Sequence, residues 1–269
     1  MAKSLSRSPI RSTLAVVAPL PEPQRPPDVS LVVPAYDEEE SLPALYERIA
    51  ETLGDRLRWE LIVIDDGSRD HTAERAAALS KKDVRVRAAS LVRNSGQTTA
   101  TRVGIEMARA PLIATLDADL QNDPADLPAM IDILRERPDV HAVVGYRTVR
   151  RDNLLRRVSS KIANGVRNRL SGDDIRDTGC SLKVFRAAPL KSMPLFEGMH
   201  RFLPTLLRFH GYRVIEHPVS HRPRVAGHSK YGVLNRAWVA FKDLLAVRWM
   251  RNRIVRPEVL VLNEESAGS

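Results

Sequence analysis

The chain has little of several features that define common protein classes, and each shortage narrows the choice. A single cysteine, Cys180, stands among 269 residues, so no disulfide can close within the chain and a reducing compartment is the simpler expectation. No apolar run approaches the roughly 18 residues of a transmembrane helix. Aromatic residues make up only 5% of the chain, which leaves few rings for stacking on nucleic-acid bases.

Two common nucleotide-binding motifs are also missing. No two glycines lie two positions apart, so the GxGxxG fingerprint of dinucleotide-binding folds is absent. Gly227 and Gly232 have the spacing of a P-loop, but Val233 stands where that motif requires lysine. Any nucleotide must therefore be bound in another way.

Positive charge is plentiful. The formal net charge is +9, which predicts an acidic partner such as a phosphorylated substrate, nucleic acid or an anionic lipid surface. We expect no nucleic acid, because aromatic residues are scarce among the basic ones. Six prolines fall in residues 1–27, which we expect to form a disordered tail and not a signal peptide, since the apolar run there is short and meets proline instead of a cleavage site.

From residue 29 onward, short apolar runs alternate with segments of helical periodicity. The pattern predicts strands at 31–33, 61–64, 84–91, 112–116 and 141–146, and helices at 42–53, 72–79, 98–109 and 126–137. Several strands lack polar alternation, which is typical of strands buried on both faces. The expected fold class is α/β, a mostly parallel sheet with helices on both faces.

Acidic residues gather where three of these strands end, at 35–40, 64–70 and 116–123. In open α/β sheets, ligands bind outside the carboxyl ends of the strands. One such cluster is easily a solvated loop, but three at one sheet edge favour a binding site. In the third cluster, Asp117 and Asp119 form an Asp-x-Asp pair, a hard-oxygen site suited to Mg²⁺ or Mn²⁺ on a diphosphate.

Four segments carry a family resemblance: VVPAYDEEES, IDDGSRDHT, RNSGQTTATRVGIEMA and DADLQNDP. In this order and spacing they resemble family 2 glycosyltransferases of the GT-A fold. DADLQ, with the later R-x-x-G-x-S-K, resembles the dolichyl-phosphate mannose synthase-like or polyprenyl-phosphate glycosyltransferase group. The resemblance covers residues 29 to about 232.

The resemblance implies roles for individual residues. The nucleotide sugar, GDP- or UDP-linked, would be bound by Pro34, Ala35, Tyr36, Glu38, Asp66, Asp117, Ala118 and Asp119. Asp119 and Gln121 would ligate the metal. The acceptor phosphate would be bound by Arg147, Arg156 (with Arg157 an equal candidate), Arg224, Ser229 and Lys230. The catalytic set would be Asp117, Asp119, Arg147, Arg224 and Asp177.

The residues also bear on the acceptor. Arginines can bind phosphate oxygens through two hydrogen bonds while keeping their charge. A hydroxyl acceptor needs a general base, whereas a phosphate oxygen is already anionic. Hydroxyl-accepting relatives usually carry a Glu-Asp pair, and this chain has no such dipeptide. Asp177 could orient the acceptor or stabilise charge, or it could simply cap a turn.

Residues 231–256 predict a basic amphipathic helix. They hold six basic residues against one acid, and one face holds Leu234, Trp238, Phe241 and Leu245. Such helices lie in the headgroup layer of membranes. An ordinary packing helix, or a contact with a membrane protein or a second subunit, remains an alternative.

We therefore expect a GT-A domain at 28–230, the interfacial helix at 231–256 and a flexible tail at 257–269. The expected function is inverting sugar transfer from a nucleotide sugar to polyprenyl phosphate, by a peripheral enzyme on the cytoplasmic face of the membrane. A family 2 transferase with a hydroxyl acceptor and a non-catalytic nucleotide-binding subunit are the alternatives. An intact DADLQ motif argues against the non-catalytic subunit.

Overall fold

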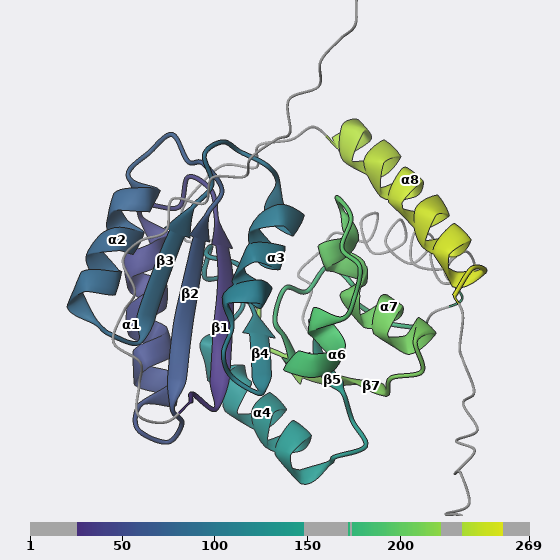
Figure 1. The fold of residues 1–269 in the computed structure, drawn as a ribbon, viewed down its shortest axis with the longest axis horizontal. Helices are drawn as coiled ribbons and strands as arrows, with labels where there is room; N and C mark the ends of the chain where they lie inside the picture. Colours follow the sequence, from purple (N-terminus) through teal and green to yellow (C-terminus); the bar gives the residue numbers. More distant parts are fainter. Residues whose placement is uncertain (1–25, 148–171, 173, 222–232, 255–269) are drawn as a thin grey trace, which may run out of the picture.

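One seven-stranded sheet forms the centre of the molecule, with strand order β3-β2-β1-β4-β6-β5-β7 (Figure 1). The computed structural model describes residues 26–147, 172, 174–221 and 233–254, and of 233–241 only the backbone. The strands are β1 Val29–Ala35, β2 Trp59–Asp65, β3 Val86–Ser90, β4 Leu112–Thr115, β5 Ala142–Arg147, β6 Lys183–Arg186 and β7 Val214–Val219. Among these, β6 alone runs antiparallel to its neighbours. The expected mostly parallel sheet is confirmed.

Helices cover both faces of this sheet, as expected. The helices are α1 Ser41–Leu53, α2 Thr72–Lys82, α3 Gln97–Met107, α4 Leu127–Glu136, α6 Ala187–Lys191, α7 Leu203–Phe209 and α8 Val233–Arg251, with short 3-10 turns η1 Pro124–Asp126 and η2 Met199–Phe202. Alternation along the strands separates two cores. Leu31 and Val33 pack with α1, α2 and α4, whereas Val32 packs on the other side with α3, α6, α7 and α8.

The predicted elements of the first half match the observed ones closely, with one shortened strand. The run at 84–91 gives β3 only from Val86, because Asp83 forms a turn in which its carboxylate accepts the Arg85 N–H at 2.9 Å. Val84 is 60% exposed, so it contributes nothing to the core. In the second half, β6, β7, α6 and α7 were not predicted, since their apolar runs are short and charged residues interrupt them.

The last described helix, α8, has two different faces. Leu244 and Val247 are buried in the core shared with α3 and α7, while Leu245 is 44% and Trp249 63% exposed. In Figure 1 this helix lies on the side of the molecule away from α1 and α2. Within the described ranges, no helix is both long and apolar enough to cross a membrane. The predicted tails at 1–27 and 257–269 lie outside the described residues, apart from Pro26 and Pro27.

Candidate active site

The three acidic strand ends meet at one edge of the sheet. Strand β1 pairs in parallel with β2 and with β4, so all three leave the sheet on the same side. The register aligns Ala35 with Asp65, and Val32 with Thr115. The loops 35–40, 64–70 and 116–123 therefore border a common region at the carboxyl ends of the strands, where ligands of such sheets bind.

The first two acidic loops are fastened to each other. The Asp37 N–H donates to Ser68 Oγ at 2.9 Å, and the Arg69 N–H donates to the Asp37 carboxylate at 2.8 Å. The Glu38 N–H donates to Thr72 Oγ1 at 2.7 Å. Polar side chains here satisfy backbone groups of the neighbouring loop. Polar and acidic side chains of these two loops therefore hold the loops in position at the edge of the site.

The predicted nucleotide contacts lie on this framework. Pro34, Tyr36 and Glu38 are half-buried at the end of β1. Ala35 and Ala118 are buried in the apolar core, so a ligand would meet their backbone more than their methyl groups.

Asp66 is held firmly by the loop before α3. Its carboxylate accepts the N–H groups of Ser95 at 2.7 Å and Gly96 at 2.9 Å, and an amide hydrogen of Asn94 at 3.1 Å. Burial raises the pKa of Asp66, while the Ser95 and Gly96 hydrogen bonds oppose this effect. Asp66 thus holds the 94–96 loop in position. A contact with the ribose or the base would be a second role of the same side chain.

Asp117 follows β4 and is oriented from two sides. Its Oδ1 accepts the Gln97 side-chain amide at 2.8 Å, at the first turn of α3. Its N–H donates to Ser181 Oγ at 3.1 Å, and Asn122 Nδ2 donates to the same oxygen at 2.7 Å. Burial and the charge of Asp119 raise the pKa of Asp117. Gln97, Ser181 and Asn122 were not singled out by the sequence, although they lie within the segments that carry the motifs.

Asp119 and Gln121 form the predicted metal-binding pair. The Gln121 N–H donates to Asp119 Oδ1 at 3.1 Å, and Leu120 between them has φ 58°, a left-handed conformation that costs a non-glycine residue about 1–2 kcal/mol. The turn brings one carboxylate and one amide to the same short loop. No cluster of three or more His, Cys, Asp or Glu ligands occurs in the described part of the chain. These donors fit Mg²⁺ or Mn²⁺, which take one or two carboxylates plus water and phosphate oxygens.

Arg147 and Asp177, both predicted as catalytic, are paired with each other. Arg147 Nε and Nη2 donate to the two carboxylate oxygens of Asp177 at 2.6 and 2.8 Å. The side chain of Asp177 is 7% exposed and that of Arg147 is 23% exposed. The bidentate pair raises the pKa of Arg147. Asp177 thus orients an arginine, and this was not expected from the sequence.

The antiparallel strand β6 brings a second cation to this edge. Lys183 is 4% exposed, and its Nζ donates to the carbonyl oxygen of Cys180. Burial lowers the pKa of Lys183, and the negative charges of Asp117 and Asp177 oppose that effect. A methyl group on Gly145 would lie 2.8 Å from the Leu182 carbonyl oxygen, so glycine lets β5 approach the turn before β6.

His200 ties η2 to the start of α3. Its Nδ1 lies 2.7 Å from Thr98 Oγ1, which also accepts the Gly198 N–H at 3.0 Å. Burial, with the charges of Arg201 and Lys183, lowers the pKa of His200 from 6.5 to about 3. The imidazole is therefore neutral at physiological pH.

Four of the predicted phosphate-binding residues, Arg156, Arg224, Ser229 and Lys230, lie outside the described residues. His221, the last described residue before Arg224, forms a β-bridge with Asn122. Asn122 follows Gln121 directly. The described range 174–221 therefore ends beside the Asp-x-Asp loop.

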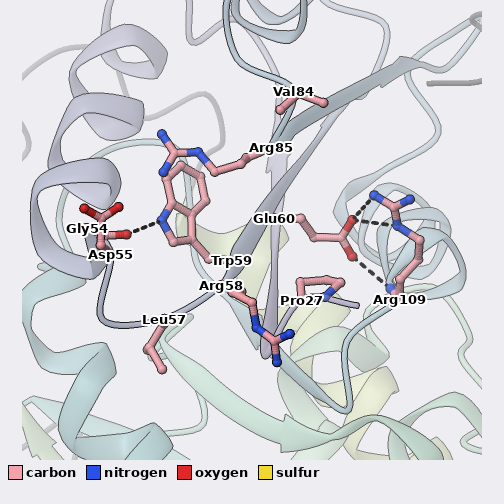
Figure 2. Close-up of a pocket in the computed structure, with 10 residues that line it drawn as sticks. All are labelled: Pro27, Gly54, Asp55, Leu57, Arg58, Trp59, Glu60, Val84, Arg85 and Arg109. Atoms are coloured by element: carbon pink, nitrogen blue, oxygen red, sulfur yellow. Dashed lines mark hydrogen bonds and ion pairs between the residues drawn. The ribbon is translucent and has the colours of Figure 1, made fainter. Parts of the chain in front are cut away.

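A cavity of about 550 Å³ lies at the opposite edge of the sheet, among the first two residues of β2 and residues that precede β1, β2, β3 and β4 (Figure 2). Side chains that line the cavity already interact with one another. Glu60 forms an ion pair with Arg109, and Arg85 stacks over Trp59 with 4.1 Å from its guanidinium carbon to the ring centre. We place the active site at the carboxyl edge, where the motif residues meet.

Comparison with known proteins identifies the family of the chain. The family model described as "Glycosyl transferase family 2" matches residues 30–193. The chain belongs to glycosyl transferase family 2. The resemblance stated from the motifs is confirmed, and the matched range includes β1 from its second residue, β2, β4 and the Asp-x-Asp loop.

Among the relatives are enzymes named for polyprenyl-phosphate acceptors. A dodecaprenyl-phosphate galacturonate synthase of Rhizobium johnstonii is 40% identical over 253 residues, covering 92% of this chain and 74% of the relative. An undecaprenyl-phosphate 4-deoxy-4-formamido-L-arabinose transferase of Edwardsiella ictaluri is 37% identical over 209 residues, covering 77% of this chain and 63% of the relative. The chain thus matches about two thirds to three quarters of their length.

The fold of the chain is similar to that of crystal structures of other glycosyltransferases. The glucosyl-3-phosphoglycerate synthase of Mycobacterium tuberculosis, crystallised with Mn²⁺, UDP and phosphoglyceric acid, has a TM-score of 0.64 and 20% identity, covering 86% of this chain and 80% of that one. The likeness confirms the expected GT-A fold.

Proposed function

We propose that this family 2 glycosyltransferase moves a sugar from a nucleotide sugar to polyprenyl phosphate, with inversion at the anomeric carbon. The observation that carries the proposal is the Asp-x-Asp loop after β4, with Arg147 at the end of β5 on the same edge of the sheet, in a chain whose relatives are named for transfer to polyprenyl phosphates. An acceptor phosphate oxygen bonds to the anomeric carbon, and the bond to the diphosphate oxygen breaks, so the nucleotide leaves with the electron pair.

The donor would lie along the carboxyl edge. Pro34, Tyr36 and Glu38 face the base from the end of β1, and Asp117 contacts the nucleotide. A divalent metal held by Asp119 and Gln121 would offset the charge that develops on the leaving diphosphate. A base preference, uracil or guanine, would follow from the loop that Asp66 fixes, and a panel of GDP- and UDP-linked sugars tests it.

The pairing of Arg147 with Asp177 supports a phosphate acceptor. Both carboxylate oxygens of Asp177 accept hydrogen bonds from Arg147, so this carboxylate is committed to orienting a cation. A hydroxyl acceptor would need such a carboxylate to remove its proton. A phosphate acceptor needs instead the cations, which Arg147 and Arg224 would provide.

The outer face of α8 would hold the enzyme on the cytoplasmic face of an anionic membrane. Leu245 and Trp249 point away from the core, and Lys242 and Arg248 are exposed near them. Basic residues flanking exposed tryptophan and leucine fit the headgroup layer. A contact with a membrane protein or a second copy of the chain would use the same face.

The acceptor is tested by comparing a short polyprenyl phosphate with the matching polyprenol. Arg224→Ala should lower transfer to the phosphate about ten- to hundredfold, the cost of one charge-assisted hydrogen bond at roughly 1.5–3 kcal/mol. Arg222→Ala, in the same segment but outside the motif, is the matched control and should keep most activity. Equal transfer to the alcohol and the phosphate would refute the proposal.

Membrane attachment is tested by flotation with anionic liposomes. The double variant Leu245→Gln, Trp249→Gln should lose most binding, and wild-type binding should weaken with salt, because exposed charges are screened over about 8–10 Å. Val247→Ala, on the inner face, should lower the stability of the protein but leave flotation intact. If the outer-face variant floats like wild type, the helix has another partner.

A further inference from the structure

His200 lies beside the turn of α3 that also reaches the Asp-x-Asp loop. Gln97 and Thr98 are the first two residues of α3, at the carboxyl edge of the sheet. The Gln97 amide donates to Asp117 Oδ1 at 2.8 Å, and Thr98 Oγ1 lies 2.7 Å from His200 Nδ1. Two adjacent residues of one helical turn therefore contact Asp117 and His200, which places the imidazole at the same edge as the proposed donor site.

The hydrogen bonds of Thr98 decide which nitrogen of His200 carries the proton. The Thr98 hydroxyl accepts the Gly198 N–H at 3.0 Å, and among the described residues its other contact is His200 Nδ1. Thr98 is only 6% exposed, so its single hydroxyl proton would be buried without an acceptor unless Nδ1 accepts it. Nδ1 is thus the acceptor, and Nε2 carries the hydrogen of the neutral ring.

The Nε2–H group of His200 is a donor that the fold leaves open. Within the described part of the chain it has no hydrogen-bond partner, and it is not among the fully buried atoms that lack one, so it meets solvent. A methyl group on Gly96, just before α3, would meet no atom within 4 Å, so the start of this helix borders open space. Because Nε2 carries a proton, it can donate to a ligand but cannot bind a metal.

The charge state of His200 indicates the kind of group that it binds. Burial, with the charges of Arg201 and Lys183, lowers the pKa of the imidazole and keeps it neutral. Diphosphate and acceptor phosphate oxygens are bound more strongly by arginines and a divalent metal than by an uncharged N–H. A neutral donor held in one place suits an uncharged oxygen, such as a sugar hydroxyl. Such a donor discriminates against a sugar that lacks the hydroxyl.

We propose that His200 donates a hydrogen bond from Nε2 to a hydroxyl group of the donor sugar and so contributes to the choice of sugar. The proposal rests on the proposed function, because it requires a nucleotide sugar at the carboxyl edge. His200 would touch the substrate and take no part in proton transfer. Thr98 would be a positioning residue, since its hydroxyl fixes the tautomer and the orientation of the ring.

Two substitutions separate a contact with the sugar from a structural role. The side-chain amide of glutamine reaches the place of Nε2, so His200→Gln keeps the outward donor and loses the acceptor for Thr98. The amide of asparagine reaches only the place of Nδ1, so His200→Asn keeps that acceptor and loses the donor. A sugar contact predicts that His200→Gln binds the sugar better than His200→Asn, and a purely structural role predicts the reverse.

The experiment measures the affinity of the full chain for nucleotides by isothermal titration calorimetry with Mn²⁺ present. The probes are UDP, GDP, a panel of UDP- and GDP-linked hexoses, and monodeoxy analogues of the hexose that wild type binds most tightly. His200→Asn should bind that nucleotide sugar about three- to tenfold more weakly, the cost of one uncharged hydrogen bond, and the free nucleotide as well as wild type does. One deoxy analogue should bind wild type more weakly than its parent, but His200→Asn equally.

His210→Asn is the matched control. His210 is also half-buried, and its Nδ1 lies 2.9 Å from the Leu206 carbonyl oxygen, but it precedes β7 at the amino edge. It should bind every probe like wild type.

Four results would overturn the proposal. His200→Asn could weaken binding of the free nucleotide as much as that of the nucleotide sugar, or weaken neither. His200→Gln could bind the sugar less well than His200→Asn. Wild type could bind all deoxy analogues like the parent, which decides the matter even if His200→Asn does not fold. If wild type binds no nucleotide sugar of the panel, the proposed donor fails and this contact with it, whereas failure of the acceptor assignment leaves the test untouched.

Discussion

The two edges of the sheet arrange their carboxylates in opposite ways. At the amino edge, Glu60 is 2% exposed and accepts hydrogen bonds from Ser30 Oγ at 2.6 Å, the Arg109 N–H at 2.9 Å and Arg109 Nε at 3.1 Å, with Arg87 at 3.4 Å. A single carboxylate there is therefore paired with two arginines, Arg87 and Arg109. At the carboxyl edge, Asp117 and Asp119 lie one residue apart, and burial raises the pKa of Asp117.

The difference shows that a cavity by itself does not mark the functional site of this molecule. The amino edge has the 550 Å³ cavity of Figure 2, but its carboxylate and its arginines already satisfy each other. At the carboxyl edge two carboxylates lie close together. A divalent metal bound to a diphosphate would offset their negative charge. Three predictions test whether the amino edge serves stability and the carboxyl edge serves chemistry.

The largest effect is expected at the carboxyl edge. Asp119→Ala should lower sugar transfer by at least a hundredfold, since electrostatic stabilisation of a developing charge is typically worth about 10²–10³ in rate. Circular dichroism and melting temperature should show that the fold survives. EDTA should abolish wild-type activity, and Mn²⁺ or Mg²⁺ should restore it. Full activity of the variant, or of wild type in EDTA, would remove the metal from the mechanism.

The matched change at the amino edge is Glu60→Gln. We expect the free energy of unfolding to fall by roughly 1.5–3 kcal/mol, because charge-assisted hydrogen bonds are lost and the partly exposed Arg87 and Arg109 lose their counter-charge. Urea unfolding measures this. Transfer per folded molecule should stay at the wild-type rate, and a selective loss of activity would give the amino edge a role in chemistry.

The smallest effect is a pH dependence of stability from His200. Its pKa is about 3 in the folded chain against 6.5 as the ordinary value, so below pH 6.5 the unfolded state binds a proton that the folded state does not. Stability is therefore lost as pH falls, by about 2 kcal/mol between pH 7 and pH 5. His200→Gln should flatten the curve by that amount in urea titrations. An unchanged pH slope would contradict a neutral imidazole at His200 in the folded chain.

Most of the first half of the fold could be predicted from sequence. Strands β1, β2, β4 and β5 are apolar runs, and α1, α3 and α4 have helical periodicity, so tertiary packing and local pattern agree. The second half could not be read this way. Strand β6 is four residues long with a charged residue at each end, and β7 contains Glu216, His217 and Pro218. Their strand state comes from pairing with distant segments, which no local pattern encodes.

The same limit applies to the site. The Asp-x-Asp motif, which we propose binds the metal, is local in sequence and could therefore be found without the structure. The Arg147–Asp177 pair joins residues 30 positions apart, and the contact of Ser181 with Asp117 joins residues 64 apart. These contacts arise because the direction of β6 returns the chain to the carboxyl edge. The roles of Lys183 and His200 depend on burial, which their segments alone do not reveal.

The insertion of β6 between β4 and β5 also sets an order of events during synthesis. Strand β4 ends at Thr115, but its neighbour on one side, β6, begins only at Lys183. Until the ribosome has made that segment, one side of β4 is an unpaired strand edge, which invites pairing with other chains. The four strands β1 to β4 can assemble early through nearby contacts, whereas β5, β6 and β7 must wait. A nascent chain that stalls before residue 183 would thus expose β4, and we expect it to aggregate.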